Sequence, residues 1–170
     1  VSRMASLEVV LEKANRPYTE EEKLVFAERK NNYYVEYLQT LDDSCILPGA
    51  FETLKYLRKR GILTAVGSAS KNAPLILEKT GLLSYLDKVS SGLDVTRSKP
   101  DPEVFLNAAG KLGLRPEECV VAEDALAGIQ AAAAGGMISL AVGPLYKSLG
   151  GTFCARNLSQ VKNWEEILER

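Results

Sequence analysis

The sequence contains no histidine, and its three cysteines are odd in number and far apart in the chain. The lack of histidine excludes Ser-His-Asp and Cys-His catalysis and most zinc sites. Cys45, Cys119 and Cys154 do not have the spacing of a disulfide framework, so we expect a reducing, cytoplasmic compartment. Any catalysis by this chain therefore has to use carboxylates, lysines or hydroxyl groups.

An excess of one charge and an apolar run of transmembrane length are lacking as well. The formal net charge of -1 removes the usual electrostatic support for binding nucleic acids or anionic membranes, and we expect neither as a partner. The 170 residues, 46% hydrophobic and 25% charged, suffice for one core and a small helical appendage. We expect a monomer that acts on a small molecule.

Residues 1–43 have the pattern of helices and carry no strand signal. Thr19 followed by three glutamates is typical of a helix start, because the threonine caps the helix and acids favour its first turn. A broad apolar and aromatic face follows, which we interpret as the core of a helical bundle rather than as a ligand contact. Its members are Val25, Phe26, Tyr33, Tyr34, Val35, Tyr37, Leu38 and Leu41.

Residues 44–170 alternate short apolar strands with helices. The predicted strands are 62–66, 88–90, 119–122 and 137–142. Helices are predicted over 50–60, through Ile76 and Leu77, and from Pro102 with Asp101 as the cap. Short strands separated by helices are typical of a parallel sheet with helices on both faces. We expect an α/β fold with a Rossmann-like core and a small all-helical part.

Polar side chains collect at one predicted edge of this sheet, and they are Ser68, Ser70, Lys71, Asn72, Lys99, Glu123 and Asp124. Ligands of parallel α/β sheets bind beyond the carboxyl ends of the strands. An acid pair suits a hard metal, while a hydroxyl and a fixed cation suit a phosphoryl group. Each residue alone has a structural alternative, because Asp124 or Ser70 can cap a helix and Lys99 can be a solvated loop charge. Their agreement on one edge favours a functional site.

The residues at this edge resemble the motifs of a known family. Ser68, the segment Ser98–Pro102 and the pair Glu123–Asp124 with Ala127–Ile129 look like the second, third and fourth motifs of the haloacid dehalogenase-like hydrolases. Within that superfamily, Ser68–Asn72 and the opening Val1–Arg3 are similar to the β-phosphoglucomutase family. The resemblance covers essentially the whole chain. It implies that residues 1–43 are part of a helical cap and that residues 44–170 are a phosphotransferase core.

The resemblance also implies roles for individual residues. Ser68 would hydrogen-bond the transferring phosphoryl group, and Lys99 would hold that group and the nucleophile. Glu123 and Asp124 would bind Mg²⁺. On the substrate's other phosphate, Arg3 of the cap would act with Ser70, Lys71 and Asn72, since a planar arginine fork suits that task. The remaining residues of the implied substrate site are Val1, Ser2, Ser6, Lys30 and Ala69.

The first motif of the family, Asp-x-Asp-Gly at the end of an apolar strand, does not occur in this sequence. Asp42 and Asp43 follow a predicted helix, and we interpret them as linker charges. We therefore expect an N-terminally truncated chain that lacks the central strand of its sheet and the aspartate nucleophile. Both neighbouring strands would lose a partner, and the chain alone would be inactive.

For the whole enzyme, the resemblance implies the interconversion of β-D-glucose 1-phosphate and glucose 6-phosphate. The reaction would depend on Mg²⁺ and pass through an aspartyl-phosphate and a bisphosphate intermediate. One alternative is a sugar-phosphate phosphatase of the same superfamily. The other is a non-catalytic phosphate-binding module, which the lack of a nucleophile would explain.

Overall fold

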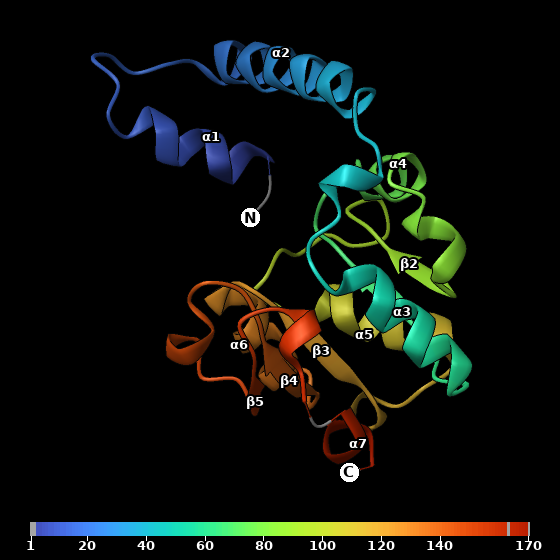
Figure 1. Cartoon of the computed structure of the whole chain (residues 1–170). Helices are drawn as coiled ribbons and strands as arrows, with labels where there is room; N and C mark the ends of the chain where they lie inside the picture. Colours follow the sequence, from blue (N-terminus) through green and yellow to red (C-terminus); the bar gives the residue numbers. More distant parts are fainter. Residues whose placement is uncertain (1–2, 163, 170) are drawn as a thin grey trace.

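The computed structural model describes residues 3–162 and 164–169, and Figure 1 shows their arrangement. Two helices, α1 (Arg3–Leu11) and α2 (Glu20–Leu38), pack against each other and lie beside an α/β part that contains the described strands. We call α1 and α2 the helical pair. Among the described residues, no helix combines the length and the apolar character needed to cross a membrane.

All strand pairings in the described part of the chain are parallel, as predicted. The strand β1 (Ala65–Gly67) pairs with β2 (Lys88–Ser90). In a second sheet, β4 (Ile138–Ala141) pairs with β3 (Val120–Glu123) on one side and with β5 (Phe153–Cys154) on the other. Within residues 3–162 and 164–169, no pairing joins the two sheets. The predicted α/β class is confirmed, but the sheet is divided in two.

A cavity separates β1 from β3. It has a volume of about 230 Å³ and is lined by all of β1, by Val121–Glu123 of β3, and by Phe105 and Ala108 of a helix behind them. Ala122 is exposed although it lies in the middle of β3. A second cavity of about 360 Å³ continues toward the amino ends of the strands and shares Leu112 and Cys119 with the first. The backbone edges of β1 and β3 that face this opening therefore lack a strand partner.

Among the described residues, five α-helices complete the α/β part, and they are α3 (Ala50–Lys59), α4 (Ala73–Lys79), α5 (Glu103–Leu112), α6 (Leu126–Ala134) and α7 (Trp164–Leu168). The helix α5 packs on β1 and β2, while α6 packs on β3 and β4. The main core cluster joins α5, β3 and α6, and its members include Val104, Phe105, Ala109, Val121, Ala131, Ala132 and Met137. α5 and α6 thus hold the two sheets in one body across the cavity.

The predicted starts of one strand and one helix are wrong, the strand by three residues and the helix by one. The strand predicted over 62–66 begins at Ala65, because the ladder with β2 starts there and the other edge of β1 has no partner. Leu63 is instead 46% exposed. The helix predicted to start at Pro102 starts at Glu103, whose backbone N–H donates to Asp101 Oδ1 at 2.9 Å. The cap position is therefore Pro102 and not the predicted Asp101, although Asp101 satisfies a free amide at the helix start.

The helical pair confirms one sequence prediction and corrects another. Thr19 caps α2 in a full capping box with Glu22. The prediction of a bundle core along the aromatic face is confirmed only in part, because Leu38 is 1% exposed whereas Tyr33 and Tyr37 are 67% and 61% exposed. Within the described residues α2 contacts the helices α1 and α4, so part of the broad face is covered while Tyr33 and Tyr37 meet solvent.

Two acids with depressed pKa values make the stability of the fold depend on pH. Hydrogen bonds from Arg16 and from the Thr19 backbone lower the pKa of Glu22 from 4.5 to about 2. Hydrogen bonds from Lys111, and then from Ser91, lower the pKa of Asp94 from 3.8 to about 2. The unfolded chain therefore takes up protons at a higher pH than the folded chain, and acid favours unfolding.

We expect the free energy of unfolding to fall as the pH decreases from 4.5 to about 2. Urea unfolding followed by circular dichroism at a series of pH values measures this. Glu22→Gln and Asp94→Asn each remove one depressed carboxyl, so each variant should show a shallower fall than the wild type. An unchanged slope in a variant would contradict the contribution of that acid.

Candidate functional site

The carboxyl ends of β1 and β3 are connected by the side chain of Lys99. Its Nζ donates to the carbonyl oxygen of Gly67 at 3.3 Å and to Glu123 Oε2 at 2.7 Å. The Lys99 and Glu123 side chains are only 16% and 11% exposed. The ammonium also lies 4.4 Å from the centre of the Phe105 ring. Lys99 is therefore not a solvated loop charge but a fixed cation at the mouth of the cavity.

Ser68 and Ser70 shape the loop that follows β1. The backbone N–H of Ser68 donates to the carbonyl oxygen of Ser90 at 2.9 Å and so continues the ladder with β2. Ser68 Oγ accepts from the Ser70 N–H, and Ser70 Oγ accepts from the Asn72 N–H, both at 3.2 Å. Each hydroxyl oxygen is thus fixed by a backbone amide, which leaves its O–H available as a donor toward a ligand.

Arg3 and Asn72 converge on one oxygen atom, although they come from different parts of the fold. Asn31 Oδ1, on α2, accepts from Arg3 Nη2 at 2.6 Å and from Asn72 Nδ2 at 3.2 Å. This polar chain connects the helical pair to the start of α4. Two of the residues predicted to grip a phosphate are therefore brought together through Asn31. The sequence analysis missed Asn31, because an asparagine in a polar stretch of helix carries no signal distinct from a solvated surface.

Glu123 is the last residue of β3 and Asp124 follows it, but the two side chains lie in different environments. Glu123 Oε1 accepts from the Ala125 N–H at 3.3 Å, while Oε2 pairs with Lys99. Asp124 is exposed and lies beside Gly143, where an added Cβ would come within 3.2 Å of the Asp124 Cβ. The N-cap of α6 is Ala125 rather than Asp124, so the capping alternative for Asp124 is wrong.

The other predicted site residues are not joined to Lys99 or Asn31 by any contact described above. Ser6, Lys30 and Lys71 are exposed, and Ala69 is half-buried in the loop after β1. The Lys30 ammonium lies 5.0 Å from the centre of the Tyr34 ring on its own helix. Val1 and Ser2 lie outside the described residues. Among the residues that the structure describes, no group of three or more histidines, cysteines or acids is placed to hold a metal ion.

Residues 2–136 match the family described as haloacid dehalogenase-like hydrolases. The chain belongs to this family. The matched range contains Ser68, Lys99 and the pair Glu123–Asp124, which the structure collects at the carboxyl ends of β1 and β3. The resemblance expected from the motifs is confirmed.

Relatives of this haloacid dehalogenase-like chain include two β-phosphoglucomutases and a phosphatase. The β-phosphoglucomutase of Bacillus subtilis (strain 168) is 33% identical over 174 residues, covering 98% of this chain and 77% of that protein. The crystal structure of β-phosphoglucomutase from Clostridium difficile matches with a TM-score of 0.90 at 36% identity, covering 99% of this chain and 76% of that chain. A fructose-1-phosphate phosphatase of Escherichia coli (strain K12) is 43% identical over 79 residues, covering 46% of this chain and 42% of that protein.

Proposed function

We propose that this chain forms the larger part of a β-phosphoglucomutase-like enzyme that interconverts β-D-glucose 1-phosphate and glucose 6-phosphate. The polar chain of Arg3, Asn31 and Asn72 is the observation that carries the proposal. The chain joins a cationic donor and an amide donor, which would serve one phosphate of the substrate while Lys99 serves the other. A bisphosphate intermediate is such a molecule. The similarity to two β-phosphoglucomutases supports this assignment.

In this proposal, residues 1–43 are a cap domain and residues 44–170 are the core. Phosphoryl transfer needs neutralisation of charge spread over the phosphoryl oxygens, and Lys99 supplies a fixed cation for it. The Ser68 hydroxyl would donate a hydrogen bond to the same group. Arg3, Asn72 and the neighbouring Ser70 and Lys71 would bind the distal phosphate and exclude water when the cap closes.

Mg²⁺ is the proposed cofactor, and the donors at the end of β3 fit it. Mg²⁺ prefers oxygen ligands and is commonly bound by one or two carboxylates, with waters and substrate phosphates completing its shell. Asp124 is an exposed carboxylate at this edge, and Glu123 lies next to it in the chain. When bound, the ion would neutralise phosphoryl charge together with Lys99.

The aspartate nucleophile is proposed to come from an additional strand between β1 and β3. The cavity there is lined by both strands, and each strand has an unpaired edge on that side. An extended segment that runs parallel to β1 and β3 can therefore hydrogen-bond to both. Its carboxyl end would lie beside Lys99, which bridges Gly67 and Glu123 at that edge. An aspartate just beyond that end would face the fixed cation.

The test is a coupled assay for glucose 6-phosphate formed from β-glucose 1-phosphate, with Mg²⁺ and a glucose bisphosphate primer. The chain alone is compared with a strand-extended protein, to which an N-terminal apolar strand ending in Asp-x-Asp-Gly, the first motif of the family, is joined. We expect activity in the strand-extended protein and none in the chain alone. A folded strand-extended protein without isomerase activity would contradict the proposal.

A sugar-phosphate phosphatase is the second candidate, because the Escherichia coli fructose-1-phosphate phosphatase is similar to part of this chain. Mutase and phosphatase differ in whether water reaches the aspartyl-phosphate once the cap has closed. The same samples assayed for released inorganic phosphate decide between them. Phosphate release without glucose 6-phosphate would support the phosphatase.

A further inference from the structure

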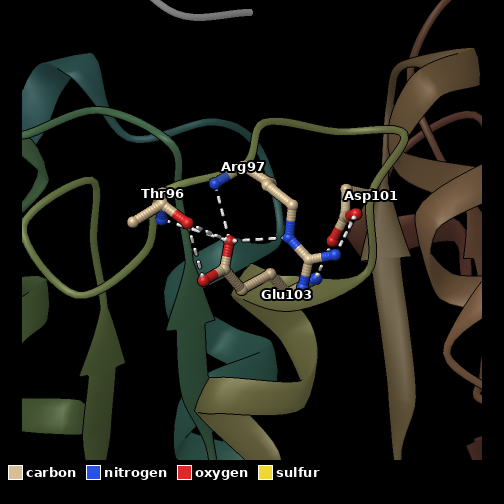
Figure 2. A network of polar contacts seen from close by, with 4 residues as sticks. All are labelled: Thr96, Arg97, Asp101 and Glu103. Carbon is tan, nitrogen blue, oxygen red and sulfur yellow. Dashed lines mark hydrogen bonds and ion pairs between the residues drawn. The ribbon is translucent and has the colours of Figure 1, made fainter.

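The loop that carries Lys99 is closed at its base by one carboxylate, that of Glu103. Glu103 Oε2 accepts from the backbone N–H groups of Thr96 at 3.1 Å and Arg97 at 2.6 Å. The Thr96 hydroxyl lies 3.3 Å from both Glu103 oxygens, and Arg97 Nε lies 3.5 Å from Oε2. Figure 2 shows these contacts converging on the carboxylate from the two residues.

A second contact closes the other side of the loop. Arg97 Nη1 forms an ion pair with Asp101 Oδ2 at 3.0 Å, and Asp101 Oδ1 accepts from the Glu103 N–H at 2.9 Å (Figure 2). Glu103 is the first residue of α5, which packs on β1 and β2. The loop is therefore anchored at both ends to a helix that is fixed on the sheet, with Lys99 between the anchors.

We propose that Glu103 is a positioning residue for Lys99. By closing the loop from Thr96 to Glu103, its carboxylate holds the Lys99 backbone at the distance from which the ammonium reaches both Gly67 and Glu123. The inference deepens the proposed function, since it is the phosphoryl-holding role of Lys99 that would need such a support. Glu103 itself does not contact the reacting atoms.

The charge state of Glu103 agrees with this role. The Arg97 backbone N–H, followed by the Thr96 donors, lowers the pKa of the Glu103 carboxyl. The group is thus an anion at neutral pH and accepts several charge-assisted hydrogen bonds, which are stronger than those of a neutral acceptor. The Glu103 side chain is 25% exposed, so water competes with these donors only in part. Glutamine at position 103 would keep the shape of the side chain and lose its charge. Its NH₂ group would also face the N–H donors of Thr96 and Arg97.

Glu118 offers a matched control. It also closes a local turn, since Glu118 Oε2 accepts from the Arg115 N–H at 2.8 Å and pairs with the Arg115 guanidinium at 3.3 Å. It lies before the amino end of β3, away from the Lys99 ammonium at the carboxyl end. Replacing either glutamate by glutamine removes one charged acceptor of a loop. Only the Glu103 change touches the loop that carries Lys99.

The experiment measures how fast the Lys99 amine is acetylated by acetic anhydride in the complete chain. Peptide mass spectrometry gives the rate, with the exposed Lys59 in the same digest as reference. In Glu103→Gln we expect the Lys99 rate to rise about fivefold, because the loop opens more often. In Glu118→Gln it should stay within the error of the wild type. Equal Lys99 rates in the wild type and Glu103→Gln would overturn the proposal.

Thr96→Val is a milder second variant, which tests the proposal even if Glu103→Gln does not fold. Thr96→Val removes one hydroxyl donor and leaves the carboxylate, so the Lys99 rate should rise by less than in Glu103→Gln. A rate unchanged from the wild type in folded Thr96→Val would count against the network. Because this readout needs no turnover, it stands even if the coupled assay finds no mutase activity. Failure of the proposed function and failure of this inference are thus distinguishable.

Discussion

Replacing Lys99 with methionine is expected to lower kcat of the strand-extended protein about 1000-fold. Methionine keeps most of the length of the side chain and removes its charge. The phosphoryl group then loses a fixed cation in a site where the Lys99 side chain is 16% exposed and its ammonium donates to Gly67 and Glu123. A steady-state coupled assay at saturating substrate measures the effect.

Lys111→Met is the matched control for this prediction. Lys111 also pairs with an acid, since its Nζ lies 2.6 Å from Asp94 Oδ1, but this pair ties α5 to the turn after β2. We expect Lys111→Met to reduce stability and to leave kcat within about twofold of the wild type. A Lys99→Met protein that kept a tenth or more of wild-type kcat would contradict the predicted loss. Comparing the free energies of unfolding of Lys99→Met and Lys99→Met/Glu123→Gln measures the separate cost to stability of leaving Glu123 unpaired.

Gly128→Ala is expected to displace Glu123 and to weaken Mg²⁺ binding about tenfold or more. An added Cβ at Gly128 would overlap Cγ, Cδ and Oε2 of Glu123, far inside van der Waals contact. Oε2 is the oxygen that pairs with Lys99, so the carboxylate has to leave its place between the two sheets. Isothermal titration of the strand-extended protein with Mg²⁺, together with the coupled assay, measures both consequences.

Another helical glycine provides the control for this steric argument. Gly110 lies inside α5, and an added Cβ there meets nothing within 4 Å. Gly110→Ala should therefore raise the free energy of unfolding by about 0.5 to 1 kcal/mol and leave Mg²⁺ affinity unchanged. Shortening the acid in Gly128→Ala/Glu123→Asp makes room for the methyl group and should restore part of the affinity. Wild-type affinity in Gly128→Ala alone would refute the argument.

The edge of the sheet proposed as the functional site is predictable from the sequence because its residues are chemically specific. Three features mark this edge: a serine, a lysine before Pro-Asp-Pro and an acid pair. Each lies at the end of an expected strand or the start of a helix, and few other folds combine all three at such places. The structure adds what separates Lys99 from a solvated charge, namely its contacts with Gly67 and Glu123. These partners are 32 and 24 residues away in the chain, and no local pattern links them.

Asn31 and the aromatic face of α2 mark the limit of prediction from sequence. Asn31 acquires its meaning from Arg3 and Asn72, which are 28 and 41 residues away. Tyr33 and Tyr37 have helical spacing and aromatic character, both typical of a core, yet burial depends on a neighbouring element that the pattern of one helix does not report. Periodicity identifies a surface that favours contact, and tertiary structure decides whether the contact is made.

The open edges of β1 and β3 also bear on how copies of this chain behave toward one another. Natural sheets commonly protect an unpaired edge with a lysine, a proline or a bulge. Ala65–Gly67 contains neither charge nor proline, and in β3 only the last residue, Glu123, is charged, so most of each open edge carries no such gatekeeper. Backbone groups on these segments can pair with any extended polypeptide, including another copy. Self-association through strand pairing therefore competes with the monomeric state as concentration rises, and a bound strand would suppress it.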